Sequence, residues 1–191
     1  MKKLIFFLAV LLTALNVGAV DISSYTNSHG EEFGINLLTK NDKPLYVSIS
    51  CETEGNTKGE IWIKPNDVHK FTTALEEVKR KLEEWQALAQ KNNVEQVSKD
   101  MAIKFPKVLF AWGLSNTFFA NDSFKVKWIF QSPLSIVLCT SKVKASTNRF
   151  ISEMFIISFY DVADIDSLIE ALSKENIDKA IATLSVADQF K

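Results

Sequence analysis

The longest regular pattern of apolar and polar residues predicts a helix of about six turns. Apolar residues recur at alternating spacings of three and four over residues 68–89, and charged residues fill the other positions. This spacing places one apolar stripe along a helix. The stripe consists of Val68, Phe71, Leu75, Val78, Leu82, Trp85 and Ala89. Asp67 stands where a side chain can cap the helix. The stripe suits packing on a sheet of the same chain, and its heptad spacing leaves a coiled-coil dimer as the alternative.

Alternation of apolar and polar residues predicts three antiparallel strands before this helix. The strands cover residues 33–37, 45–52 and 59–64, and turn residues separate them at 41–44 and 54–58. The second strand alternates most regularly, and its pattern places Cys51 on the core side. The polar residues 20–31 are expected to form a loose leader.

The second half repeats the order of strands followed by helix. Strands are predicted over residues 107–112, 124–130 and 134–139, and a further strand ends near Tyr160. A helix follows with Ile165, Leu168 and Leu172 on one face, and a last short helix is expected after Asn176. Residues 94–104 are interpreted as a linker or a short helix. The Phe118-Phe119 pair lies in an apparent loop between two of these strands.

The two halves can be aligned on one another. Pro44-Leu45 leading to Cys51 matches Pro133-Leu134 leading to Cys139 within one residue, and the helix residues match at identical spacing from Asp67 and from Asp164. We therefore expect an α+β fold of antiparallel sheets, each covered by a helix, as two tandem units. The expected division is 1–19, signal peptide; 20–31, leader; 32–93, first unit; 94–104, linker; and 105–191, second unit.

The N-terminus has the pattern of a secretory signal peptide. A basic start is followed by an apolar run over residues 4–15, and small residues stand at Val17-Gly18-Ala19. We expect cleavage after Ala19 and a periplasmic or extracellular protein. The apolar run is short for a membrane span. An uncleaved N-terminal anchor remains the alternative.

The charge balance argues against nucleic acid as a partner. The full chain has 22 Lys and Arg and 23 Asp and Glu. Cleavage after Ala19 removes Lys2 and Lys3, which leaves 22 − 2 = 20 basic against 23 acidic residues and a net charge of −3. A chain of this balance has no overall basic field, which nucleic-acid binding requires.

Candidate chemistry is sparse. The chain has no G-x-S-x-G and no H-E-x-x-H motif. In an exported chain Cys51 and Cys139 can form a disulfide, and the alternative is two separate buried thiols. A hydrolase or thiol enzyme that uses a Cys or an Asp with His69 is the remaining catalytic hypothesis.

Acidic residues gather where the second helix is predicted to start. Asp161, Asp164, Asp166 and Glu170 carry oxygens that a hard cation could use. Helix capping and the helix dipole explain acids at this position without a metal. The sequence therefore predicts neither a metal site nor a cofactor.

Aromatic residues concentrate between residues 105 and 130. They are Phe105, Phe110, Trp112, Phe118, Phe119, Phe124, Trp128 and Phe130. An apolar pair in a loop either fills the core or contacts a partner, so Phe118 and Phe119 are candidate binding residues. Trp85, near the far end of the long helix, is the third. The resulting hypothesis is an exported, non-catalytic binding or accessory protein that contacts another protein. The alternative is a carrier of a small apolar ligand in a cavity between sheet and helices.

Overall fold

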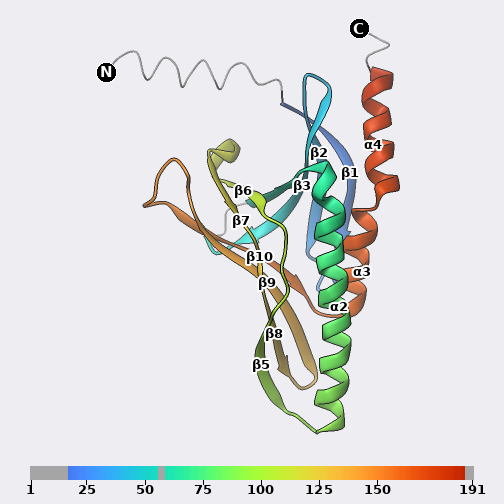
Figure 1. Ribbon diagram of the computed structural model, residues 1–191, viewed down its shortest axis with the longest axis vertical. Coiled ribbons are helices and arrows are strands. Elements are labelled where there is room, and N and C mark those ends of the chain that lie inside the picture. Colours follow the sequence, from blue (N-terminus) through green and yellow to red (C-terminus); the bar gives the residue numbers. More distant parts are fainter. Residues whose placement is uncertain (1–16, 56–58, 188–191) are drawn as a thin grey trace.

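The computed structural model describes residues 17–55 and 59–187, and it confirms a mixed α+β fold with antiparallel pairing (Figure 1). The start of the expected signal peptide, residues 1–16, lies outside the described residues. The strands are β1 (Val17–Thr26), β2 (Glu32–Lys40), β3 (Lys43–Thr53), β4 (Gly59–Ile63), β5 (Gln96–Met101), β6 (Val108–Trp112), β7 (Phe118–Asp122), β8 (Lys125–Gln131), β9 (Leu134–Lys144) and β10 (Ser152–Phe159). The helices are α2 (Val68–Lys91), α3 (Val162–Ala171) and α4 (Lys174–Ala187), with 3-10 turns η1 (Pro65–Asp67) and η2 (Leu114–Asn116).

The sheet divides at β3. One edge of β3 pairs with β4, which continues to β6 and β7. The other edge pairs with β2 along its first part and with β10 at its end, where Phe155 lies opposite Thr53 and Ile156 opposite Glu52. From β10 the sheet continues through β9 and β8 to β5. Both arms of the sheet therefore depend on one strand.

The two halves share one topology. The order β1-β2-β3-β4 followed by α2 recurs as β5-β8-β9-β10 followed by α3, with the hairpin β6–β7 between β5 and β8. Cys51 and Cys139 lie on the third strand of each unit. The helices match less well than the sequence indicates, because Asp67 is the N-cap of α2 whereas the N-cap of α3 is Asp161. Asp164, aligned with Asp67 by sequence, lies three residues inside α3.

Two segments that the sequence assigns to a loose leader and to a linker or short helix form strands. The expected leader, residues 20–31, contains most of β1, which pairs along the length of β2. Tyr25 is buried and its ring stacks on Phe33 at 5.4 Å. The expected linker, residues 94–104, contains β5, which among the described strands pairs with β8 alone and so forms an edge of the sheet. Few side chains of either strand are buried, and most of residues 21–26 of β1 and most of β5 are polar, so the alternation of apolar residues is weak.

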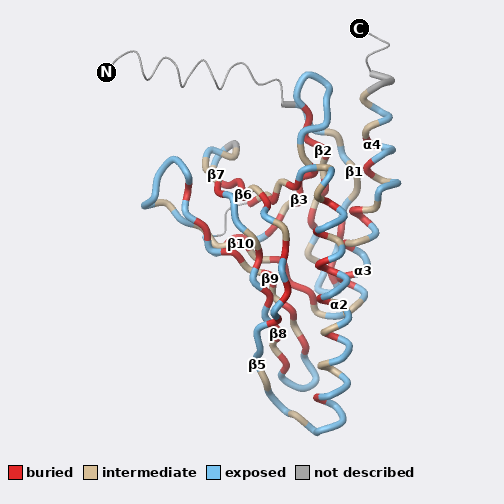
Figure 2. The backbone as a smooth tube through the Cα atoms, in the orientation of Figure 1, coloured by how far each residue is buried: buried red, intermediate tan, exposed pale blue. Residues whose placement is uncertain are grey.

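The helices cover one face of the sheet, called here the inner face. Phe71 of α2 packs against Phe105 and Phe124, with ring centroids 5.1 and 6.4 Å apart. The hydroxyl of Ser23 on β1 donates to the carbonyl of Ala171 in α3 at 3.1 Å. Figure 2 shows buried residues along the strands and on the side of α2 that faces them. The apolar stripe of α2 is thus covered by its own chain, as expected for packing on the sheet.

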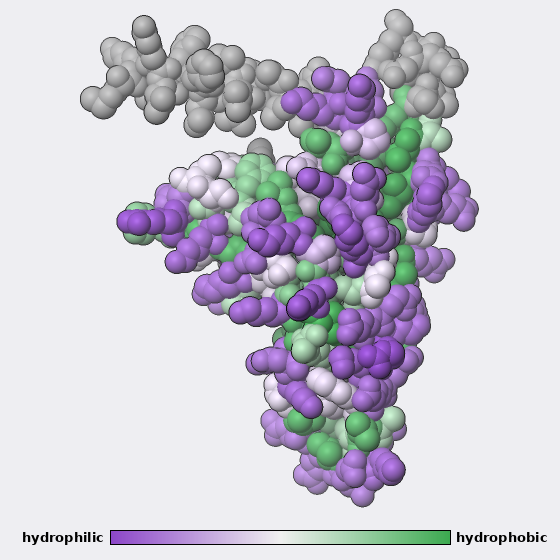
Figure 3. Space-filling view, in the orientation of Figure 1, coloured by the Kyte–Doolittle hydropathy of each residue, from purple (hydrophilic) through white to green (hydrophobic). Residues whose placement is uncertain are grey.

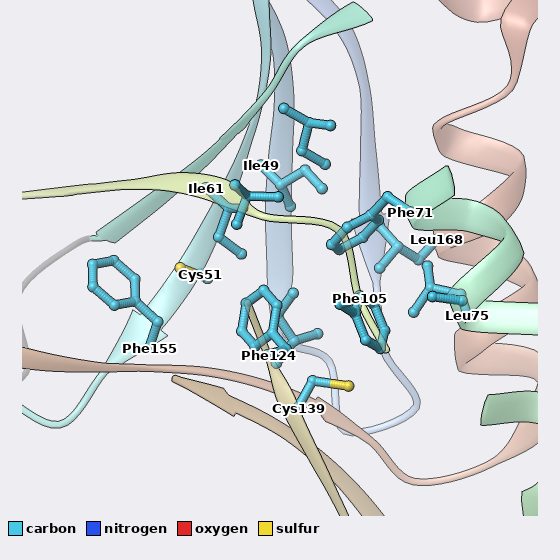
Figure 4. Packing of buried hydrophobic residues seen from close by; sticks show 14 of the residues in the cluster. Ile49, Cys51, Ile61, Phe71, Leu75, Phe105, Phe124, Cys139, Phe155 and Leu168 are labelled. Atoms are coloured by element: carbon cyan, nitrogen blue, oxygen red, sulfur yellow. The ribbon is translucent and has the colours of Figure 1, made fainter. Parts of the chain in front are cut away.

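Most of the aromatic concentration forms part of the core. Phe105, Phe110, Trp112, Phe124, Trp128 and Phe130 are all buried. Phe155 joins them, with its ring 4.7 Å from Phe110 and 5.6 Å from Trp112. Figure 4 shows Phe105, Phe124 and Phe155 within the buried cluster. Gly59 on β4 permits this packing, because a Cβ at Gly59 would lie 2.6 Å from the Phe155 ring.

Candidate binding surface

Phe118 and Phe119 lie on strand β7, not in a loop. Neighbouring residues of a strand point to opposite faces of the sheet. Phe118 therefore turns inward, where its ring lies 5.8 Å from Trp112. Phe119 turns outward, where its ring lies 5.3 Å from Trp62 of β4. Of the two interpretations of this pair, filling the core applies to Phe118, which packs on the core. Contact with a partner is open to Phe119, which of the two is the one on the outer face.

Phe119 belongs to a row of aromatic side chains on the outer face. Tyr46 of β3 lies 5.6 Å from Trp62, and Trp62 lies 5.3 Å from Phe119, with interplanar angles of 34° and 59°. All three are half-buried. We call Tyr46, Trp62 and Phe119 the aromatic row. The helices pack on the inner face, so the row lies on the face that they leave uncovered.

A carboxylate is fixed beside this row. Oε2 of Glu60 accepts hydrogen bonds from Nε1 of Trp62 at 2.6 Å and from the hydroxyl of Ser48 at 2.9 Å. These bonds hold the Trp62 indole and the Glu60 carboxylate in a set relation to each other. The residues opposite Glu60 on the neighbouring strands are Ser50 and Ala111, whose side chains are short. Glu60 is therefore positioned where a ligand on the outer face can reach it.

The outer face around the aromatic row is acidic. Pairing register and strand alternation place Asp21, Glu32, Glu52 and Glu60 on this face. Two lysines on the same face, Lys40 and Lys43, sit at the turn between β2 and β3. Burial, together with the nearby Glu31, raises the pKa of the Glu52 carboxyl. The resulting negative field favours a cationic partner.

The two cysteines are free and buried. They lie on β3 and β9 with β10 between them, and Ile157 of β10 lies directly opposite Cys139. Two strand spacings amount to about 9.5 Å, and a disulfide requires Cα atoms within about 7 Å. Of the two alternatives, a disulfide or separate buried thiols, the structure has separate buried thiols. Figure 4 shows the two cysteines apart.

These thiols are poor nucleophiles. Burial raises the pKa of the Cys139 thiol to about 12, and burial, with Glu60 second, raises the pKa of Cys51. Reactivity requires the thiolate. His69 is exposed at the start of α2, whereas both thiols are buried. The geometry therefore gives no support to a Cys–His pair.

The acidic residues at α3 have structural partners. The Asp161 carboxylate caps the helix by accepting from the Asp164 amide at 3.1 Å. Asp164 is buried and accepts from the amides of Ser28 and Tyr160 at 2.8 and 2.7 Å. Asp166 pairs with Lys79 of α2 at 2.6 Å. Among the described residues, no group of three or more His, Cys, Asp or Glu side chains is placed to hold a metal ion.

Trp85, the third candidate, lies far along α2 from the aromatic row. Its ring lies 5.5 Å from Trp128, and the Lys99 ammonium lies 4.7 Å from the ring centroid. Leu88 beside it is 48% exposed. Trp85, Leu88 and Val97 line a hollow of about 220 Å³. The structure thus separates Trp85 from Phe119, and the two do not form one site.

A larger groove lies between the start of α2 and helices α3 and α4. Its volume is about 680 Å³, and its apolar lining comprises Val68, Ile169, Leu172, Ile177 and Ile181. His69, Lys174 and Asp178 are among its polar residues. Figure 3 shows apolar side chains along α4 where this helix lies beside α2.

Sequence reasoning missed Tyr46, Trp62 and Glu60. Their alternation with buried neighbours already placed Tyr46 and Trp62 on the solvent side of their strands. The pairing of β4 with β6, which brings Trp62 near Phe119, joins distant segments and has no signal in a single sequence.

None of the described helices is long and apolar enough to cross a membrane. Comparison with known proteins gives no relative, since no family model, curated protein or solved structure matches the chain.

Proposed function

We propose that this chain is an exported, non-catalytic binding protein that contacts a basic segment of another protein through the aromatic row. The observation that carries the proposal is the contiguous set of Tyr46, Trp62 and Phe119 rings beside the fixed Glu60 carboxylate. Aromatic side chains supply large contact areas at low entropic cost and are enriched where binding energy concentrates.

The charge of the surrounding face defines the chemistry of the partner. An Arg or Lys side chain can stack on the Trp62 indole and pair with Glu60 in one pose. Asp21, Glu32 and Glu52 extend the same negative field along the face and would steer a cationic segment towards it. An arginine-bearing strand or loop of another exported protein has the required chemistry.

Site-specific photo-crosslinking in the producing cells tests this proposal. A benzoyl-phenylalanine at Phe119 keeps an aromatic ring in the row, and the same probe at the exposed Leu88 serves as the matched control. We expect a protein adduct from position 119 that the Leu88 probe does not give. The adduct should disappear with Glu60→Gln and weaken as the salt concentration rises. Equal adducts from both positions, or none, would refute the assignment.

Export is tested separately by the intact mass and N-terminal sequence of protein recovered from the producing organism. We expect the chain to begin at Val20. Because β1 starts at Val17, cleavage after Ala19 would remove three residues from it and leave Tyr25 and its contacts in place. A chain that retains residues 1–19 would favour an uncleaved N-terminal anchor.

The groove between α2 and α4 favours the carrier hypothesis as a second candidate. Its volume and apolar lining are in the range of small-molecule sites. It lies between helices and not between sheet and helices, where a cavity was expected. Native mass spectrometry should then show added mass that leaves on denaturation and is lost with Ile177→Trp. A bare mass for protein purified without detergent would count against a carrier.

A further inference from the structure

The outer face of the β8–β9 arm carries a patch of four lysines. Val126, Trp128 and Phe130 of β8 are buried, so Lys125 and Lys127 point outward. On β9 the buried residues Val137, Cys139, Ser141 and Val143 likewise place Lys142 and Lys144 outward. We call Lys125, Lys127, Lys142 and Lys144 the lysine face. The chain as a whole has a formal charge of −1, so this patch departs from the rest of the molecule.

Few acidic groups offset these lysines. Asp100 of β5 lies opposite Lys127, and Glu54 pairs with Lys142 at 3.9 Å. Within the described ranges, Lys125, Lys127 and Lys144 take part in no ion pair. Half-buried apolar side chains, including Leu138 and Ile156, lie between the lysines.

The hairpin that carries Lys142 and Lys144 ends in an exposed aromatic residue. Phe150 is 85% exposed, and the Arg149 guanidinium lies 5.1 Å from its ring centroid. In Figure 1 the β9–β10 loop extends away from the helices. Phe150 gains little burial within its own chain, so its ring is available to a surface that contacts this tip.

A second apolar tip lies beside the first. Leu114, on η2 between β6 and β7, is 91% exposed. The two loops are joined at their bases, where the Ser146 amide donates to the carbonyl of Phe119 at 2.8 Å. Two neighbouring tips therefore each present one apolar side chain, next to a cationic face.

From this arrangement we infer that the lysine face and the Phe150 and Leu114 tips bind the surface of an anionic lipid bilayer. Lysines without fixed partners match the diffuse negative charge of lipid headgroups, and each contributes attraction near such a surface. Projecting Phe and Leu side chains can enter the headgroup boundary, as apolar groups of peripheral proteins do. The inference does not rest on the aromatic row, which lies on the acidic arm.

Co-sedimentation with vesicles tests it. The protein is expressed as the full chain, and its N-terminus is established by intact mass. We expect binding to vesicles of phosphatidylcholine mixed with phosphatidylglycerol, and little binding to phosphatidylcholine alone. High salt should release the protein, because the screening length falls from about 10 Å at 0.1 M to about 3 Å at 1 M.

Matched variants locate the contact. Lys125→Gln with Lys144→Gln should lower the partition coefficient about 30-fold, at about five-fold for each lysine. The control pair, Lys70→Gln with Lys174→Gln, makes the same change of net charge on the helices and should leave binding within about two-fold. Phe150→Ser should reduce binding about ten-fold, whereas Leu88→Ser, an exposed apolar residue elsewhere, should not.

Three results would overturn the inference. They are equal binding to neutral vesicles, an equal loss in the control variants, and no binding to anionic vesicles at low salt. The last result would assign the lysine face to an acidic protein instead.

Discussion

Replacement of Gly59 by alanine should destabilise the protein through steric conflict with two buried side chains. The added Cβ would lie 2.6 Å from Cε1 of Phe155 and 2.6 Å from Cγ2 of Thr53. Carbon atoms in contact are normally about 3.5–4.0 Å apart, so the ring must move by about 1 Å. Phe155 cannot move freely, because it is fully buried against Phe110 and Trp112.

The magnitude follows from two opposing effects. Overpacking of a core destabilises the folded state by about 1–3 kcal/mol. Alanine also restricts the unfolded chain more than glycine does, which stabilises the folded state by about 0.4–1 kcal/mol. We expect a net loss of about 1–2 kcal/mol, which corresponds to a fall in Tm of roughly 2–8 °C for a chain of this size. Urea unfolding measures the loss as a lower midpoint at unchanged slope.

The control is Gly34→Ala, whose Cβ would meet only Asn36 and Ser50 at 3.7 Å. We expect this variant to match or exceed the stability of the parent chain. Phe155→Leu should relieve the conflict with the ring but not the contact with Thr53. The double variant with Gly59→Ala should therefore lose less than the sum of the single changes by about 0.5 kcal/mol or more. Additive losses, or a Gly59→Ala variant as stable as Gly34→Ala, would refute the steric reasoning.

Other measurements address the two thiols, the Glu52 carboxyl and the Tyr25 hydroxyl. Because burial raises both thiol pKa values, Cys51 and Cys139 should resist a thiol reagent in the native protein. Both should react in denaturant. Fast labelling of the folded chain would contradict the burial of the thiols. The raised pKa of Glu52 means that the folded state holds its proton more tightly than the unfolded state does. Its contribution to stability is therefore complete below the ordinary value of 4.5 and is lost as the pH rises through the folded value. Glu52→Gln should flatten the decline of Tm above pH 4.5, and parallel curves for both proteins would argue against a perturbed carboxyl. The Tyr25 hydroxyl is buried without a hydrogen-bond partner among the described residues. Tyr25→Phe should therefore raise the free energy of unfolding by about 1 kcal/mol, which urea unfolding measures as a higher midpoint. A loss of stability would indicate that the hydroxyl has a hydrogen-bond partner.

The sequence predicts best those elements whose side chains enter the core. The apolar stripe from Val68 to Ala89 gives α2 almost to the residue, and the alternation around Cys51 gives β3 and its inner face. The sequence does not predict β1 and β5, because in each strand the polar residues outnumber the buried residues. The alternation of apolar and polar residues reflects which side chains are buried, and strands at the edge of a sheet bury few side chains.

The candidate site was predictable only in part. Phe119 is conspicuous in the sequence, but the hairpin geometry that turns it away from Phe118 is not. Asp67 shows a similar limit, since it stands at the N-cap of α2 yet makes no capping bond there and instead pairs with Lys70 at 2.7 Å. The contact of Phe119 with Trp62 is set by segments that meet only in the folded chain, whereas the pair of Asp67 and Lys70 is local.

The dependence of both sheet arms on β3 has a kinetic consequence. The pairs between β3 and β10 join residues about a hundred positions apart, and the bond from Ser23 to Ala171 spans 148 positions. Such long-range closures are slow to form because loop entropy is lost before the contacts are gained. The first half of the chain cannot complete its sheet until β10 has been synthesised. We therefore expect slow, cooperative folding, and chains that end before β10 to remain open to proteolysis.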